Sequence, residues 1–328
     1  MALALGVDIG ASFIRVGVID RDGRVLTKER VPVPPEGDEN TMADLITGSI
    51  RNKLPKEQVE ASIAVGIGSI GPLDLRSGNV IIAPNLKWRI KKFKVVEPIR
   101  RALGKQVILC NDAAAAAWGE HVFGDGRGVD NMVYITLSTG IGAGVIVDGN
   151  LLMGKDGNAH EVGHFVVDAE LGIKCGCGGV GHWEAVASGG NMPRSISLFA
   201  QKRYAGPHTE LYRRAVSGPP PSAQEIFRYA KEGDDFAVQY VDYISEVHAM
   251  GMANIVNSYD PELIVLGGSV ILNNSDLLMP SIIEKMKKYA ANRLPEIKLT
   301  RFGDDIGIIG AAALVHDVPS TLRKFLVG

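Results

Sequence analysis

Cysteine is scarce in this sequence, and neither sign of charge dominates it. The 328 residues include three cysteines, Cys110, Cys175 and Cys177. An odd number, with two of them one residue apart, is not the pattern of a secreted disulfide framework. The formal net charge is −2, so the chain has no overall positive field that would attract nucleic acid or an anionic membrane. We therefore expect partners of neither kind.

Long hydrophobic runs are also missing. The longest uncharged stretch, from Asn131 to Val147, is interrupted by Ser138, Thr139 and several glycines, and it predicts a hairpin rather than a membrane span. The first residues contain no basic segment and reach Asp8 before an apolar run of signal length could form. We expect a cytoplasmic protein.

Two similar arrangements of strands organise the sequence. Apolar runs at 3–9 and 13–19 flank a short turn and precede a third strand at 24–33, and runs at 131–137 and 141–147 repeat the pattern. This order predicts an α/β protein of two halves with a ligand cleft between them. The other expected elements are helices at 42–53, 95–103, 113–122, 238–258 and 307–316, strands at 61–67, 107–109 and 263–266, and a surface loop at 206–222.

Both short turns have the chemistry of a phosphate-binding loop. The first contains Asp8, Gly10, Ala11 and Ser12, and the second contains Ser138, Thr139 and Gly140. Glycine lets the backbone N–H groups approach phosphate oxygens, and a carboxylate such as Asp8 suits Mg²⁺ or its bound water. Each turn alone is also compatible with a purely structural role. The sequence contains neither a GxxxxGK[ST] loop nor a GxGxxG fingerprint in this region, which argues against those nucleotide sites.

Asn111 and Asp112 lie where a buried strand meets the first turn of a helix. A carboxylate there is held by rigid elements and is favoured by the helix N-terminus. Asp112 is therefore a candidate general base that accepts the proton of an attacking hydroxyl in phosphoryl transfer. The alternative is that Asp112 only caps the following helix.

Histidines and cysteines are concentrated between residues 160 and 182. His160-Glu161-Val-Gly-His164 matches the HExxH zinc-protease motif, which requires a helix, but Gly163 and the β-prone residues that follow argue against one. The segment CGCGGVGH indicates instead a structural zinc site of Cys₂His₂ type. Its four ligands would be His164, Cys175, Cys177 and His182. The alternative is that the cysteines are ordinary small buried residues.

These segments together resemble the ROK family of repressors and sugar kinases, in the actin-like ATPase superfamily. The resemblance rests on GVDIGASFIRVGVID, NDAAAAAWGE, LSTGIGAGVI, HEVGH, CGCGGVGHWEA and IVLGGSV, and it covers nearly the whole chain. It implies two actin-like (ribonuclease H-like) domains, with bounds of 1–112 plus about 306–328 and of 113–305. It also implies a homodimer or homotetramer that uses ATP with Mg²⁺ and a structural Zn²⁺.

The resemblance also implies roles for individual residues. Asp112 would be the general base. The ATP and Mg²⁺ site would comprise Asp8, Gly10, Ala11, Ser12, Thr139, Gly140, Gly267 and Gly268. The hexose would contact Asn85, Asn111, Asp112, Glu161, His164 and Glu184. Two departures stand out: Phe13 occupies the position of the usual lysine of the first loop, and His182 that of the usual third cysteine of the knuckle.

The function expected from these features is ATP-dependent phosphorylation of a hexose at the 6-hydroxyl. Glucose is favoured because Asn85 lies in PNLKW, which resembles the glucokinase form of that loop, and the alternatives are fructose, mannose or an N-acetylhexosamine. Trp88 or Trp183 would stack on the sugar or belong to the core. A sugar-sensing regulator is disfavoured because seven residues precede Asp8, too few for a helix-turn-helix. A zinc peptidase and an actin-like filament protein are also disfavoured.

Overall fold

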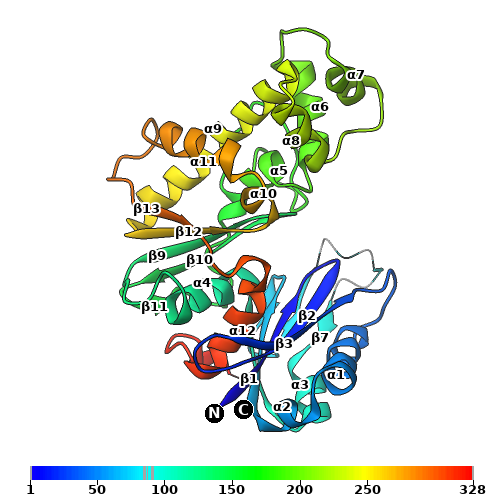
Figure 1. The fold of residues 1–328 in the computed structure, drawn as a ribbon, viewed down its shortest axis with the longest axis vertical. Coiled ribbons are helices and arrows are strands. Elements are labelled where there is room, and N and C mark those ends of the chain that lie inside the picture. The colour runs from blue at the N-terminus through cyan, green and yellow to red at the C-terminus, as the bar shows by residue number, and fades with distance from the viewer. Residues whose placement is uncertain (1, 84–85, 87, 90–91, 327–328) are drawn as a thin grey trace. The chain divides into compact units, whose positions relative to one another are not determined.

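Two compact units divide the chain. The computed structural model describes residues 2–83, 86, 88–89 and 92–326. The first unit comprises Met1–Tyr134, Gly144–His160 and Thr300–Gly328, and the second comprises Ile135–Ala143 and Glu161–Leu299. Both contain helices and strands, which confirms the predicted α/β class (Figure 1). The domain bounds expected from the sequence remain a prediction.

A five-stranded sheet of order β3-β2-β1-β4-β8 forms the centre of the first unit. The predicted N-terminal meander is confirmed, because β1 pairs with β2 and β2 with β3 in antiparallel registers, while β1, β4 and β8 are parallel. Apolar residues of β1, β2, β4 and β8, many of them β-branched, form the core, whereas β3 at the edge of the sheet is mostly exposed or half-buried. The strands are β1 (Leu3–Ile9), β2 (Phe13–Ile19), β3 (Val25–Pro32), β4 (Ser62–Ser69) and β8 (Gln106–Asn111).

Helix α12 (Ile306–His316) packs directly on β1 and β4 and against α4 (Asp112–Phe123). Its approach depends on glycine, because a Cβ built at Gly66 would lie 1.8 Å from the carbonyl oxygen of Ala311. The first unit thus buries its sheet under the last long helix of the chain (Figure 1). Its other helices are α1 (Thr41–Lys53), α2 (Lys56–Ala61), α3 (Val96–Leu103) and the 3₁₀ turns η2 (Gly303–Asp305) and η3 (Arg323–Phe325).

A second five-stranded sheet has the order β11-β10-β9-β12-β13. Its strands are β9 (Met132–Leu137), β10 (Ile141–Val147), β11 (Asn150–Leu151), β12 (Leu263–Gly267) and β13 (Glu296–Leu299). The predicted repetition of strand, turn and strand is therefore present. A small third sheet contains β5 (Leu73–Asp74), β6 (Asn79–Val80) and β7 (Phe93–Lys94).

The second unit is mostly helical and is organised by the long helix α9 (Asp235–Tyr259), which packs against α5, α8 and α11. The prediction of a surface loop at 206–222 is wrong for its middle part, where the structure has helix α7 (Glu210–Ser217). Thr209 caps a helix there, and Leu211 and Ala215 bury its apolar side, a pattern that the flanking Pro and Gly residues obscured. The other elements are η1 (Val162–His164), α5 (Trp183–Ala187), α6 (Met192–Lys202), α7 (Glu210–Ser217), α8 (Ala223–Lys231), α10 (Ser269–Leu272) and α11 (Ser275–Met286).

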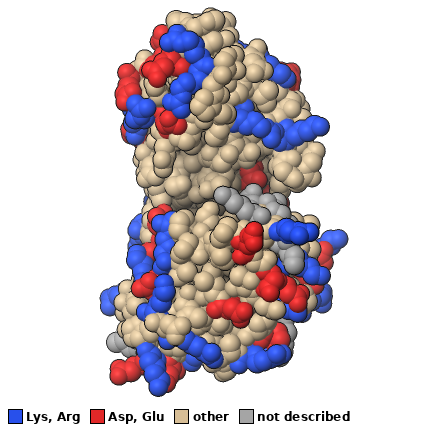
Figure 2. All heavy atoms as spheres, turned by 90° about the vertical axis from the view of Figure 1, so that its right-hand side faces the viewer, with Lys and Arg blue, Asp and Glu red and all other residues tan. Residues whose placement is uncertain are grey.

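The surface carries both signs of charge. Figure 2 shows lysine and arginine interspersed with aspartate and glutamate over the face that it presents. Among the helices that the structure describes, none has the length and apolar character needed to cross a bilayer.

Candidate active site and metal cluster

The first predicted phosphate turn connects β1 to β2. Gly10 N–H donates to the carbonyl of Phe13 over 3.0 Å and closes the turn. At the end of β1, Asp8 accepts a hydrogen bond of 3.0 Å from Arg15 on β2. Burial raises the pKa of Asp8, and the guanidinium opposes this rise. Gly307 at the start of α12 lies against the same carboxylate, since a Cβ there would be 2.6 Å from its Oδ2.

Asn111, rather than Asp112, caps helix α4. Its Oδ1 accepts hydrogen bonds from Ala113 N at 3.0 Å and Ala114 N at 3.1 Å. Asp112 is the first residue of the helix, where its Oδ1 accepts from Ala113 N at 2.8 Å. The helix cap is therefore Asn111 and not Asp112, and the carboxyl group of Asp112 lies at the positive end of the helix dipole.

Parallel pairing brings the first predicted phosphate turn and the N-terminus of α4 to one edge of the first sheet. Ile9 is in register with Ser69, and Ser69 with Asn111. The turn that follows β1 and the helix that follows β8 therefore begin at the carboxyl ends of parallel strands, where α/β sheets commonly bind ligands. The sequence placed Asp8 and Asp112 at strand ends, and the register places these ends on the same edge.

The second predicted phosphate turn, between β9 and β10, is braced by three glycines, Gly189, Gly190 and Gly268. The N–H groups of Gly189 and Gly190 donate to the carbonyls of Ser138 and Thr139 over 2.8 and 3.0 Å. Gly268 has a φ of 92°, and a Cβ there would lie 2.5 Å from the carbonyl oxygen of Leu137. Glycine at position 268 therefore allows the loop after β12 to lie against this turn.

Glu184 connects the second turn with the cysteine-rich segment. Its Oε2 accepts a hydrogen bond of 3.1 Å from Ile141 N, and a Cβ at Gly140 would lie 2.6 Å from the same oxygen. Partial desolvation raises the pKa of Glu161, with His164 opposing and Glu184 reinforcing the rise. Two carboxylates therefore influence each other, one of them in contact with the second predicted phosphate turn, and both can accept hydrogen bonds from hydroxyl groups.

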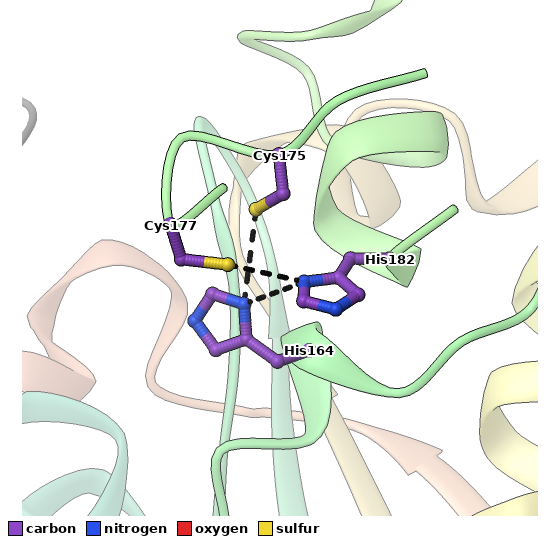
Figure 3. A group of neighbouring side chains, drawn as sticks. All are labelled: His164, Cys175, Cys177 and His182. Atoms are coloured by element: carbon purple, nitrogen blue, oxygen red, sulfur yellow. Dashed lines mark hydrogen bonds between the residues drawn. The ribbon is translucent and has the colours of Figure 1, made fainter. Parts of the chain in front are cut away.

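The four predicted metal ligands converge (Figure 3). The ligand atoms of His164, Cys175, Cys177 and His182 all lie within 4.8 Å of one another. The two Nδ1 atoms are 3.1 Å apart, Cys175 Sγ is 3.7 Å from Nδ1 of His164, and Cys177 Sγ is 3.3 Å from Nδ1 of His182. The cluster has the composition and closeness of a site that could bind a metal ion.

The electrostatics of the cluster also suit a cation. Burial raises the pKa of the Cys175 thiol, so a thiolate there requires a positive neighbour. Burial and the adjacent His164 lower the pKa of His182, which favours the neutral imidazole needed for coordination. Cys110, outside the cluster, is buried in β8, where burial raises its pKa to about 12.

The HExxH motif is not helical. Only Val162–His164 form a single 3₁₀ turn, and Phe165 is extended. His160 has a φ of 60° and is not part of the cluster found among the described residues. The two histidines of the motif therefore do not share a helix face, which confirms the prediction that this segment is not a helix.

Three other predicted residues have distinct outcomes. Trp88 and Trp183 are both buried, so of the two alternatives left open by the sequence the structure favours a place in the core. Trp88 donates to the carbonyl of Pro34, and Trp183 to His248. Asn85 lies outside the described residues.

Sequence reasoning missed the residues that support the predicted site. Arg15 is a charged residue in an otherwise apolar strand, a signal that could have identified the partner of Asp8. Gly189 and Gly190 form a glycine pair directly after a short helix, which is also visible in the sequence. The contact between Glu184 and Ile141 has no local signal, because 43 positions separate the two residues.

Comparison with known proteins shows which family this chain belongs to and which proteins it is similar to. The sequence profile of the ROK family matches residues 4–318. The chain is 42% identical over 331 residues to a glucokinase of Aeropyrum pernix, covering 99% of this chain and 100% of the relative. It is 42% identical over 327 residues to a glucokinase of Pyrobaculum calidifontis, covering 99% of each. A crystal structure of a ROK family glucokinase from Streptomyces griseus with glucose and AMPPNP matches with a TM-score of 0.77 and 31% identity, covering 95% of this chain and 99% of that one.

Proposed function

Because the chain belongs to the ROK family, we propose that it is an ATP-dependent glucokinase that phosphorylates the 6-hydroxyl of glucose. The structural observation that carries this proposal is the position of Asp112, since Asn111 performs the capping and the carboxylate shares a sheet edge with the first phosphate turn. Phosphoryl transfer depends on positioning and charge, together with one group that accepts the hydroxyl proton.

Asp112 is the general base. Its carboxylate takes the proton of the 6-hydroxyl as that oxygen forms a bond to the γ-phosphorus, and the bond from phosphorus to the β,γ-bridging oxygen breaks. ADP leaves with the electron pair of that bond. The N-terminus of α4 favours the ionised carboxylate before the reaction. Asn111 keeps its side-chain amide N–H₂ group available for a sugar hydroxyl while its oxygen caps the helix.

We assign the nucleotide phosphates to the two turns. The residues assigned to phosphate oxygens are Gly10, Ala11 and Ser12 of the first turn and Thr139 and Gly140 of the second, and those assigned to the adenosine are Gly267 and Gly268. Asp8 would hold Mg²⁺ directly or through water, since it presents a carboxylate oxygen, the donor that this ion prefers. When bound, Mg²⁺ neutralises charge on the phosphate oxygens.

The second unit supplies hydrogen-bond acceptors for the sugar. Glu161, His164 and Glu184 are assigned to the hexose hydroxyls, and Nε2 of His164 faces Glu161 at 3.9 Å while its Nδ1 belongs to the metal cluster. Asn85 completes the assignment. Kinases for fructose, mannose or an N-acetylhexosamine remain the alternatives, because these sugars differ from glucose in few substituents.

Zn²⁺ is the ion proposed for the Cys₂His₂ cluster. Tetrahedral zinc with bonds of about 2.3 Å to sulfur and about 2.05 Å to nitrogen places its ligand atoms about 3.3–3.8 Å apart. The two separations between sulfur and nitrogen, 3.3 and 3.7 Å, lie within this range, and the 3.1 Å between the two Nδ1 atoms lies just below it. Bound zinc supplies structural cross-linking and no chemistry of the reaction. The proposal also includes a cytoplasmic homodimer or homotetramer.

The test is an ADP-release assay over a panel of hexoses, with Asp112→Asn as the variant. We expect kcat to fall by about 10²-fold or more, the scale of general base catalysis, while the Kd for glucose stays near that of the unchanged protein. Asp235→Asn is the matched control, because Asp235 is also the first residue of a helix, α9, and its loss removes the same dipole interaction. Turnover by Asp112→Asn at the rate of this control would refute the assignment.

A further inference from the structure

One buried histidine in the second unit has no part in the proposed reaction. His248 lies on α9 and is fully buried, and its Nδ1 accepts a hydrogen bond of 3.0 Å from Nε1 of Trp183. The two rings meet edge to face with centroids 5.9 Å apart. Because Nδ1 accepts, the proton of the neutral imidazole is on Nε2, for which no described residue is an acceptor.

Trp183 stands between two residues with different assignments. His182 precedes it and belongs to the metal cluster, and Glu184 follows it and accepts from Ile141 N of the second phosphate turn. His182, Trp183 and Glu184 are consecutive at the start of α5, so a shift of the indole would move the backbone from which both neighbouring side chains project. The backbone of Trp183 is itself tied to Phe165, the residue after His164, by a hydrogen bond of 2.8 Å from Trp183 N to Phe165 O.

The pocket around the indole is closely fitted. A Cβ at Gly251 on α9 would lie 2.3 Å from the ring of Trp183, so the helix backbone itself forms one wall. The hydrogen bond to His248 fixes the remaining freedom, which is rotation and sliding of the ring within the pocket. Burial lowers the pKa of His248 to about 3, so the acceptor nitrogen stays unprotonated over the range in which proteins are assayed.

We propose that His248 is a positioning residue that anchors Trp183 and thereby sets His182 in the metal cluster and Glu184 at the phosphate turn. This inference rests on the proposed function for Glu184 and on the proposed zinc site for His182. It predicts that one buried hydrogen bond affects two properties, metal retention and the use of glucose.

The test compares His248→Leu, which removes the acceptor, with His248→Asn, whose Oδ1 can take the place of Nδ1. We expect His248→Leu to release zinc to a chromogenic chelator about tenfold faster and to raise the KM for glucose, in line with the cost of disturbing groups behind metal ligands. His248→Asn is expected to restore both properties. Ser245→Ala is the control, because Ser245 is a buried polar residue on the same helix that bonds only within it, to Val241 O.

A double-mutant cycle separates positioning from general loss of stability. Trp183→Phe removes the donor, so adding His248→Leu to it should change zinc release little beyond the single variant. Additive effects of the two changes would overturn the proposal. The proposal would also be overturned by a His248→Leu protein that loses thermal stability but retains zinc and an unchanged KM for glucose, or by a protein that takes up no zinc.

If His248→Leu does not fold, Trp183→Phe and His248→Asn supply the same comparison. Absence of any hexokinase activity would sink the proposed function, while the zinc-release cycle would still report on the anchor.

Discussion

The contact between Glu184 and the second predicted phosphate turn predicts that this carboxylate, which the proposed function assigns to the sugar, also affects the use of ATP. Glu184→Ala removes the acceptor of Ile141 N, which lies 3.1 Å from Oε2. A hydrogen bond to a charged group contributes about 1.5–3 kcal/mol, and the half-buried position of Glu184 favours the lower end. A loss of about 1.5 kcal/mol corresponds to roughly a tenfold rise in the KM for ATP. The KM for glucose should rise as well.

The assay measures ADP release while ATP is varied at saturating glucose. Glu184→Gln is expected to keep most of the ATP affinity, because its amide oxygen can still accept from Ile141 N, although it loses charge at the sugar. Glu161→Gln is the control, since Glu161 belongs to the same proposed sugar site and its ion-pair partner among the described residues is His164 rather than the turn. If Glu184→Ala and Glu161→Gln gave the same KM for ATP, the reasoning would be refuted.

Three further predictions concern the rest of the chain. Gly66→Ala should lower the melting temperature, at a cost of about 1–3 kcal/mol for overpacking, because its Cβ would lie 1.8 Å from a carbonyl of α12. Gly48→Ala, which meets nothing within 4 Å in α1, should stabilise by about 1 kcal/mol, and equal effects of the two would contradict the packing argument. Arg15→Met should raise the pKa of Asp8, which the proposed function assigns to Mg²⁺ as an ionised carboxylate, so the acidic limb of kcat/KM for ATP should move to higher pH. An unchanged limb would exclude Asp8 as its origin. Cys177→Ser should lose zinc and melt at a lower temperature in metal analysis and calorimetry, whereas Cys110→Ser, outside the cluster, should retain the metal.

Much of the fold was predictable because its signals are local. The apolar runs of β1 and β2 and the alanine-rich start of α4 depend on residues that are neighbours in the sequence. The helix within 206–222 was missed because proline and glycine on both sides outweighed an eight-residue amphipathic pattern.

The candidate site could be predicted where its residues lie close together in the sequence. It could not be predicted where it depends on contacts between residues far apart in the sequence. Two cysteines one residue apart, with histidines nearby, predicted a metal site. The convergence of the four side chains in the structure agrees with this prediction. The sequence could not show whether Asn111 or Asp112 caps helix α4, because either side chain can cap a helix. The hydrogen bonds from Ala113 N and Ala114 N show that Asn111 does. The bond between Trp183 and His248 joins residues 65 positions apart and has no sequence signal.

The packing of α12 on β1 and β4 has a consequence for synthesis. Strands β1 and β4 precede α12 in the chain, so the sheet face on which this helix packs cannot be covered by it until residues 306–316 have been made. Until then an apolar face of the nascent sheet lacks its native helix and is prone to aggregate. Ribosome-bound chains arrested before Ile306 should be cleaved readily by protease within β1 and β4, and chains extended past His316 should resist.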